Sequence, residues 1–369
     1  MKGSDRVNEI KKFLKKEAAA VIAVTAAVIS CFLVPVTDYG EYVDTDVISL
    51  LFCLMTVVAG LKKGNVFRKI TGVVTRIAGN GRRLAFLLVL SVFFVSMLVT
   101  NDVALITFVP FTLMIYRELN RSPVYTVVLQ TIAANMGSAF TPFGNPQNLY
   151  LFTRSEMSPG EFFGITAKPC AISLLLLVIC MLPIKPDKIT EVKTHRVSLK
   201  NPRFLILYGM LFVLCVLSVF GVVDNITLFA SVCVVAAILQ PSVFHDVDYG
   251  LLVTFAAFFI FVGNIKNVPQ VTSFMEWVIA GRELETAVIL SQFISNVPAA
   301  VMLSGFTDNT PALIIGTDIG GLGTLIASLA SLISFKAYAG SKGADVKKYL
   351  GVFTGMNILF LAVLYIFCR

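Results

Sequence analysis

Long apolar segments recur along almost the whole chain, from Glu17 to the C-terminus, and they constrain its fold more than any other feature. A helix needs about 20 mainly apolar residues to cross a hydrocarbon core of roughly 30 Å, and segments of that length are repeated here. Hydrophobic residues make up 57% of the chain and charged residues only 14%, which is far from the composition of soluble domains. The sequence therefore predicts an all-α polytopic membrane protein without a separate soluble domain.

Lysine and arginine are clustered between the apolar segments. Five stretches hold 25 of the 30 basic residues, namely 1–16, 62–83, 117–121, 185–203 and 336–348. Basic loops of membrane proteins stay on the cytoplasmic side, so the net charge of +8 is explained by topology and predicts no nucleic-acid partner. We expect a multi-pass protein of a bacterial or archaeal plasma membrane with a cytoplasmic N-terminus. The first apolar segment lacks a convincing cleavage site and is predicted to be a retained helix.

The charge pattern predicts about nine full spans, near residues 17–36, 47–61, 123–152, 164–184, 203–221, 225–240, 249–264, 313–335 and 349–367. Two other apolar stretches, 84–117 and 285–306, are interrupted by polar residues. Arginines flank both ends of the first stretch, and the arms of the second rise only about 15 Å each at 1.5 Å per residue. Both are predicted to be re-entrant helical hairpins, whose irregular backbone must be satisfied by protein or water. An amphipathic segment precedes each, at 62–83 and 267–283.

The chain also contains an internal repeat. Val99–Ile106 aligns with Ile294–Val301, and Asn135–Leu149 aligns without gaps with Asp318–Leu332. The odd number of helices between the halves predicts an inverted arrangement, with one hairpin entering from each side of the membrane. The predicted organisation is a first repeat at 1–184 (hairpin 84–117, broken helix 123–152), a loop and connecting helix at 185–221, and a second repeat at 222–369 (hairpin 285–306, broken helix 313–335).

Hairpin tips and broken helices expose N–H and C=O groups that can hold an anion at helix N-termini and a cation at helix C-termini. A single polar break can also be a capped or kinked helix, but the paired recurrence favours a site. The predicted substrate- and ion-binding residues are Thr100, Asn101, Asp102, Asn135, Gly137, Ser138, Thr141, Pro142, Gly144, Asn145, Asn148, Ser295, Asn296, Pro298, Asp318, Gly320, Thr324 and Ser328.

Asp102 and Asp318 are acids within otherwise apolar segments, where such groups are costly. An acid at membrane depth can bind Na⁺ or take up a proton. The alternative is a structural role as the cap of a helix N-terminus. No cofactor is predicted, and Na⁺ or H⁺ is the expected coupling ion.

Three motifs, Thr100–Ala104, Gly137–Leu149 and Ser295–Ala300, resemble the ion transporter superfamily. This group includes citrate transporters, arsenite permeases, NhaD-type antiporters and divalent anion/sodium symporters. The resemblance covers nearly the whole chain. It implies a scaffold domain and a transport domain, a homodimer and an elevator-like motion. It further implies two clamps, with Na⁺ expected at Asn101, Gly137 and Asn145 and at Asn296, Gly320 and Ser328.

The function expected from the residues and the resemblance is secondary active transport of a small anion, a carboxylate or an oxyanion, coupled to Na⁺ or H⁺. The tips read Thr-Asn-Asp and Ser-Asn-Val, whereas the dicarboxylate branch reads Ser-Asn-Thr at both. The first tip is closer to the arsenite and NhaD branches, so an antiporter or arsenite-type efflux permease that uses Asp102 is the alternative. A channel and an intramembrane aspartyl protease are remote alternatives. No enzymatic activity is expected.

Overall fold

The computed structural model describes residues 18–34, 39–188 and 198–369. The basic residues predicted to be cytoplasmic at 1–16, and part of those at 185–203, lie outside the described residues. Within them the chain forms helices joined by loops, and the β pairing found there is one isolated bridge between Asn80 and Lys188. The prediction of an all-helical fold is confirmed.

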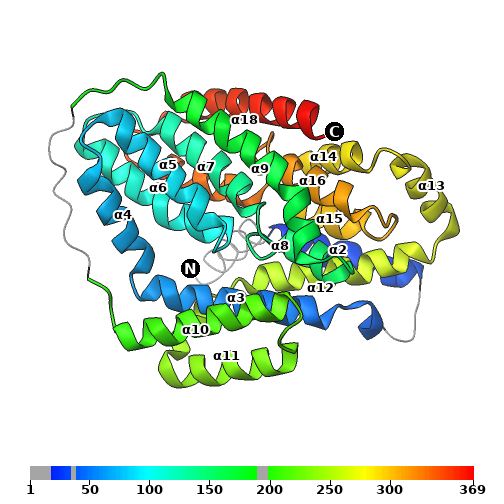
Figure 1. Cartoon of the computed structure of the whole chain (residues 1–369). Helices are drawn as coiled ribbons and strands as arrows, with labels where there is room; N and C mark the ends of the chain where they lie inside the picture. Colours follow the sequence, from blue (N-terminus) through cyan, green and yellow to red (C-terminus); the bar gives the residue numbers. More distant parts are fainter. Residues whose placement is uncertain (1–17, 35–38, 189–197) are drawn as a thin grey trace, which may run out of the picture.

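One group of helices lies along one side of the molecule (Figure 1). Their apolar side chains form a first core, which also includes residues of α8, α15 and α16. The group consists of α2 (Ala18–Leu33), α3 (Thr45–Lys63), α10 (Pro202–Val219), α11 (Asn225–Leu239) and α12 (Tyr249–Lys266), with the short helices η1 (Tyr39–Tyr42) and η2 (Pro241–Asp246) at the ends of α3 and α11.

A second core lies on the opposite side of the molecule, where α18 runs along the edge beside α9 (Figure 1). Its helices are α5 (Gly81–Ser96), α6 (Asn101–Glu118), α7 (Val124–Ser138), α9 (Pro159–Met181), α14 (Glu283–Ile294), α16 (Thr310–Gly320), α17 (Leu329–Ala339) and α18 (Val346–Cys368). Two short helices, α8 (Pro146–Arg154) and α15 (Asn296–Leu303), contribute instead to the first core. The breaks before α8 and α15 therefore lie where the two cores meet.

Two amphipathic helices, α4 (Val66–Ile77) and α13 (Pro269–Ile279), lie at the periphery (Figure 1). They fall within the two segments that were predicted to be amphipathic. Val73 on α4 is 45% exposed, and the only tryptophan, Trp277 on α13, is 76% exposed. Apolar residues on such helices can lie at the boundary between headgroups and acyl chains.

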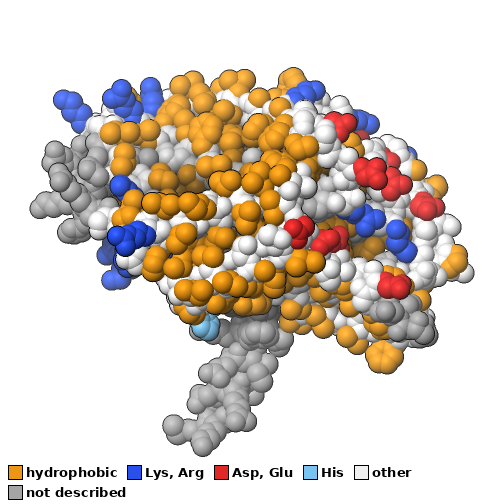
Figure 2. Space-filling view, turned by 60° about the horizontal axis from the view of Figure 1, so that its bottom comes forward, with side chains coloured by type: hydrophobic (Ala, Val, Ile, Leu, Met, Phe, Trp, Pro, Cys, Tyr) orange, Lys and Arg blue, Asp and Glu red, His pale blue; other side chains and the backbone are white. Residues whose placement is uncertain are grey.

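The outer surface is strongly apolar. Figure 2 shows a face dominated by hydrophobic side chains, with the visible Asp and Glu toward one end and Lys and Arg at both. Among the described residues, five helices are long and apolar enough to cross a membrane, namely α3, α9, α10, α12 and α18, and three apolar helices are shorter. A continuous apolar surface of this extent suits a lipid environment. The protein is thus a polytopic membrane protein, while the predicted number of nine spans stays a prediction.

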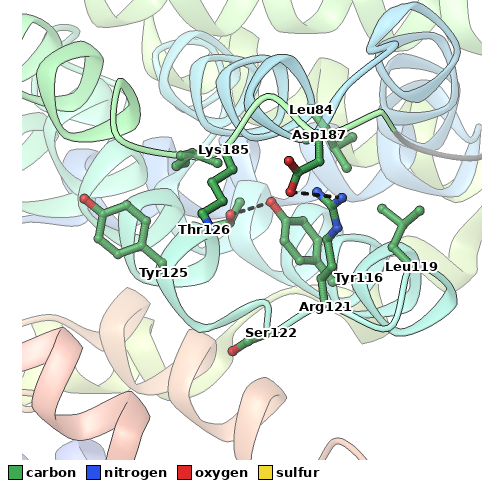
Figure 3. Close-up of a pocket in the computed structure, with 11 residues that line it drawn as sticks. Leu84, Tyr116, Leu119, Arg121, Ser122, Tyr125, Thr126, Lys185 and Asp187 are labelled. Atoms are coloured by element: carbon green, nitrogen blue, oxygen red, sulfur yellow. Dashed lines mark hydrogen bonds and ion pairs between the residues drawn. The ribbon is translucent and has the colours of Figure 1, made fainter.

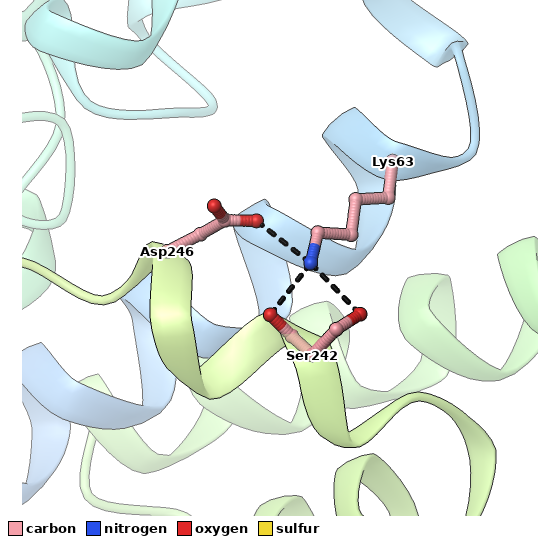
Figure 4. A network of polar contacts seen from close by, with 3 residues as sticks. All are labelled: Lys63, Ser242 and Asp246. Atoms are coloured by element: carbon pink, nitrogen blue, oxygen red, sulfur yellow. Dashed lines mark hydrogen bonds and ion pairs between the residues drawn. The ribbon is translucent and has the colours of Figure 1, made fainter.

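Polar contacts tie the end of α3 to η2 (Figure 4). Lys63 Nζ lies 2.9 Å from Asp246 Oδ2 and donates hydrogen bonds to the Ser242 carbonyl oxygen at 2.6 Å and to Ser242 Oγ at 2.9 Å. These contacts join segments almost 180 residues apart in the chain, since the separation of Lys63 and Ser242 is 179. They close one end of the first helix group beside the basic end of α3.

Candidate substrate and ion site

The first polar interruption separates α5 from α6. Thr100 precedes α6, and its side chain makes no capping hydrogen bond. Asn101, the first residue of α6, is only 6% exposed. Its backbone N–H donates to the Gly144 carbonyl oxygen at 3.3 Å, and its Nδ2 donates to Asn135 Oδ1 at 3.2 Å. One residue therefore fixes the first tip to the first broken helix through both its main chain and its side chain.

The first broken helix is interrupted at residues 139–145, between α7 and α8. Gly144 packs so closely on Ser138 that a Cβ atom would collide with the Ser138 carbonyl group. Pro146 occupies the first turn of α8, where a missing N–H is tolerated, and Asn145 Oδ1 caps this helix by accepting from the Asn148 N–H at 2.9 Å. Thr141 Oγ1 donates to the carbonyl oxygen of Met97, in the first tip, at 2.6 Å.

The second tip joins α14 to α15 at Ser295. This residue is buried and has φ 75° and ψ 152°, a conformation that is rarely adopted by residues other than glycine. Asn296, the first residue of α15, donates its backbone N–H to the Ala327 carbonyl oxygen at 3.0 Å. Pro298 lies in the first turn of α15 and is buried. The second tip is thus attached to the second broken helix, as the first tip is to the first.

The second broken helix is interrupted at residues 321–328, between α16 and α17. Thr324 Oγ1 donates to the main-chain carbonyl oxygen of Gln292 at 3.0 Å, and the Thr324 N–H donates to Gln292 Oε1 at 2.9 Å. Gly320 packs against Ser291 and Val288 of α14, where a Cβ would be too close. The side chain of Gln292 is therefore bonded directly to the backbone of this break.

Asp318, on α16, is 3% exposed and reaches across to the first broken helix. Its Oδ1 accepts from Asn145 Nδ2 at 3.1 Å and from Gln147 Nε2 at 3.3 Å, and its Oδ2 accepts from Asn148 Nδ2 at 2.9 Å. A buried carboxylate needs hydrogen bonds or a cation to offset the loss of water. Three neutral amides provide the hydrogen bonds here.

Asn135, on α7, makes the reciprocal connection to the second broken helix. Its Oδ1 accepts from Ser328 Oγ at 3.0 Å and its Nδ2 donates to the Gly321 carbonyl oxygen at 3.4 Å. The same Oδ1 accepts from Asn101 Nδ2, so Asn135 links one tip to both breaks. It is 4% exposed.

These contacts occur in pairs that follow the internal alignment. The Asn101–Gly144 bond corresponds to Asn296–Ala327, and Thr141–Met97 corresponds to Thr324–Gln292. The cross-contact of Asn145 with Asp318 corresponds to that of Ser328 with Asn135. Close packing of Gly137 on Phe93 and Ser96 corresponds to that of Gly320 on Val288 and Ser291. Contacts within one sequence half are thus repeated in the other.

Some predicted residues contribute differently. Asp102 receives no side-chain hydrogen bond at its buried Oδ1 from the described residues, and its backbone N–H donates to Asn101 Oδ1 at 2.9 Å. Ser138 Oγ donates to the Asn135 carbonyl oxygen within its own helix at 2.9 Å. Pro142 is buried in the first break, where it can shape the backbone but offers no N–H.

Sequence reasoning missed Gln292 and did not assign Gln147 a partner. Gln292 lies in a hairpin arm, outside the polar break, and only its alignment with Met97 marks it as unusual. The described residues hold no group of three or more His, Cys, Asp or Glu side chains that could bind a metal ion. The available ligands are mainly neutral oxygens, which suit hard cations such as Na⁺.

A cavity of about 290 Å³ lies away from these breaks, near the loop between α6 and α7 (Figure 3). Arg121 Nη2 and Asp187 Oδ2 are 3.6 Å apart at its edge, and Tyr116 Oη and Thr126 Oγ1 share a hydrogen bond of 2.6 Å. None of the predicted site residues lines it. It is therefore distinct from the candidate site.

The sequence matches known proteins over most of its length. Residues 10–312 match the family described as Citrate transporter. An uncharacterized transporter of Methanocaldococcus jannaschii is 31% identical over 330 residues, which cover 89% of this chain and 90% of the relative. The inner membrane protein YbiR of Escherichia coli is 31% identical over 83% of each chain. A silicon efflux transporter of Oryza sativa is 31% identical over 148 residues, or 39% of this chain and 30% of the relative. The expected superfamily membership is confirmed, and the chain belongs to the citrate transporter family.

Proposed function

We propose that the protein is a secondary active transporter that moves a small anion, a carboxylate or an oxyanion, together with Na⁺ or H⁺. One observation carries this proposal, namely the meeting of two tips and two broken helices in one hydrogen-bonded unit around Asn135 and Asp318. Such unwound segments at membrane depth hold substrates and coupling ions in many secondary transporters. Both the geometry of the site and the membership of a family of transporters support this function.

The helix ends provide both kinds of binding group. The N-termini of α6, α8, α15 and α17 follow the tips and breaks, and their N–H groups and positive dipole ends favour an anion. The C-termini of α7 and α16 provide carbonyl oxygens, which favour a cation. We assign the coupling ion mainly to the first site, at Asn101, Gly137 and Asn145.

The paired contacts support an inverted repeat of residues 1–184 and 222–369 with re-entrant hairpins at 84–117 and 285–306. We infer that α2, α3, α10, α11 and α12 form the scaffold, since their apolar side chains share one core, which the second group enters mainly through α8, α15 and α16. The second group, with the tips and breaks, would then move in an elevator-like motion within a homodimer whose N-termini are cytoplasmic. Cross-linking of cysteine pairs between α12 and α15 in two transport states tests this motion.

The experiment that tests the function starts from purified protein. Ligands that bind the folded state raise its melting temperature by mass action, so citrate, succinate, sulfate, arsenite and silicate are compared, each with Na⁺, Li⁺ or choline. Any stabilising anion is then used for uptake into proteoliposomes driven by a Na⁺ or pH gradient. Saturable, gradient-driven uptake supports the proposal, and uptake that neither gradient drives contradicts it.

One observation favours a second candidate, a cation/proton antiporter or arsenite-type efflux permease. The buried Oδ1 of Asp102 has no hydrogen-bond partner among the described residues, so this carboxylate has capacity left for a proton or a cation. Under this alternative, Asp102→Asn abolishes the pH dependence of flux in proteoliposomes. Unchanged pH dependence in this variant would exclude the alternative.

A further inference from the structure

The side chain of Gln292 is held by the second break in a way that resembles the coordination of a cation. Its Nε2 lies 2.8 Å from the Gly320 carbonyl oxygen, 3.0 Å from that of Leu322 and 3.0 Å from that of Val288. Its Oε1 accepts from the Thr324 N–H at 2.9 Å. One neutral amide thus gathers three carbonyl oxygens around a single nitrogen atom.

Two of these carbonyl groups, those of Gly320 and Leu322, belong to a helix C-terminal end and the unwound backbone after it, whereas Val288 lies within α14, one turn before Gln292. Gly320 is the last residue of α16 and Leu322 lies in the break that follows it. Carbonyl oxygens at such ends carry partial negative charge and have no helical N–H partner, which makes them the usual backbone ligands of Na⁺ in broken helices. At this position the Gln292 amide satisfies them without carrying a charge.

The first repeat differs at the equivalent position, which is Met97 in the ungapped extension of the alignment. The main-chain contact is preserved, since Met97 and Gln292 both accept from the aligned threonines, Thr141 and Thr324. A thioether has no N–H, so Met97 cannot donate to the carbonyl oxygens of the first break. The Ala139 carbonyl oxygen, which aligns with that of Leu322, accepts from Asn148 Nδ2 at 3.2 Å. The Gly137 carbonyl oxygen, which aligns with that of Gly320, accepts from main-chain N–H groups, including that of Phe140 at 3.1 Å, and receives no side-chain hydrogen bond from the described residues.

We propose that the Gln292 amide takes the place of a cation at the second break, so that the transporter couples to one ion, bound at the first break. This inference rests on the proposed function and deepens it by fixing which of the two predicted cation clamps is used. The expected Na⁺ at Asn296, Gly320 and Ser328 is then replaced by a side chain of the protein itself. Gln292 is a residue that determines coupling, and it need not touch the transported anion.

The test uses purified full-length protein and measures melting temperatures in NaCl and in choline chloride at equal concentration. Gln292→Met copies the residue of the first repeat and removes the amide. We expect this variant to melt lower than the unsubstituted protein in choline and to gain at least about 2 °C more from Na⁺. Met97→Gln is the reciprocal variant, and it is expected to lose the Na⁺ response of the unsubstituted protein.

Two further variants complete the test, a control at the neighbouring residue and a second substitution of Gln292. Phe293→Met changes the neighbouring, 73% exposed residue and is expected to leave the Na⁺ response unchanged. Gln292→Glu keeps the size of the side chain but removes its donors, so it is expected to show a Na⁺ response at least as large as that of Gln292→Met. Both Gln292 variants should purify as monodisperse protein in Na⁺, because the cation replaces the lost hydrogen bonds.

The inference would be overturned if Na⁺ raised the melting temperature of both Gln292 variants by no more than that of the unsubstituted protein. Failure of both variants to fold in Na⁺ would overturn it as well. Failure of the proposed function is distinguishable from these outcomes, because it removes gradient-driven uptake by the unsubstituted protein. If the coupling ion is H⁺, the unsubstituted protein shows no Na⁺ response, yet Gln292→Met is still expected to gain one.

Discussion

Substitution of Asn148 tests directly whether hydrogen bonds to Asp318 hold the two halves of the chain together. Its Nδ2 donates to Asp318 Oδ2 at 2.9 Å and to the Ala139 carbonyl oxygen at 3.2 Å, and the side chain is fully buried. A hydrogen bond to a carboxylate contributes about 1.5–3 kcal/mol and a neutral one about 1 kcal/mol. Asn148→Ala should therefore lower the free energy of unfolding by about 3 kcal/mol. Gln147→Ala should cost about half as much, because Asp318 Oδ1 keeps its bond from Asn145.

The assay is denaturant-induced unfolding of purified protein in one detergent, with Asn357→Ala as the control. Asn357 is equally buried, but among the described residues its Nδ2 donates only within its own helix, to the Phe353 carbonyl oxygen at 2.9 Å. Combining Asn148→Ala with Asp318→Ala completes a double-mutant cycle, for which we expect a coupling free energy of about 1.5–3 kcal/mol. The reasoning is refuted if Asn148→Ala costs no more than the control, or if the two substitutions are additive.

Three other changes follow from the backbone and the tips. Gly137→Ala should lower the free energy of unfolding by about 1–3 kcal/mol because its Cβ would collide with α5, whereas Gly209→Ala, with nothing within 4 Å of the added atom, should not lower it. Ser295→Gly should raise the free energy of unfolding by about 1 kcal/mol, because it removes the backbone strain at φ 75°. Thr100→Gly, at φ −63°, should not raise it. Equal changes in the free energy of unfolding of the two variants would contradict this prediction. Asn101→Ala should abolish uptake into proteoliposomes while monodisperse protein is still obtained, because the residue joins the first tip to its break.

The positions of the breaks could be predicted because local chemistry determines them. Proline and glycine cannot continue a helix in the usual way, so the Gly144-Asn145-Pro146 sequence marks the interruption between α7 and α8. The polar residue Ser295 separates α14 from α15 for a related reason, since it interrupts an apolar run. The number of spans could be predicted only approximately, because three of the apolar helices are shorter than a bilayer-spanning helix.

The contacts across the site could not be predicted in the same way. Asp318 binds residues about 170 positions earlier in the chain, and no periodicity in a sequence encodes which amides it receives. The sequence offered both Asp102 and Asp318 as candidate acids, and it could not show that the side chain of Asp318 is held by three amides. Gln292 was overlooked because it lies in a hairpin arm, outside the polar break, and the sequence does not show that its side chain reaches the carbonyl oxygens at the end of α16.

The reciprocal contacts of Asn135 and Asp318 have a consequence for biogenesis. The amides at 145–148 are synthesised about 170 residues before their acceptor, and Asn135 is synthesised 193 residues before Ser328. During translation, the first break must therefore wait in the translocon or the bilayer with its polar groups bound to water or to a chaperone. Chains that stop before Asp318 would keep these amide groups unpaired. Proteases of membrane quality control could recognise such chains by those polar groups.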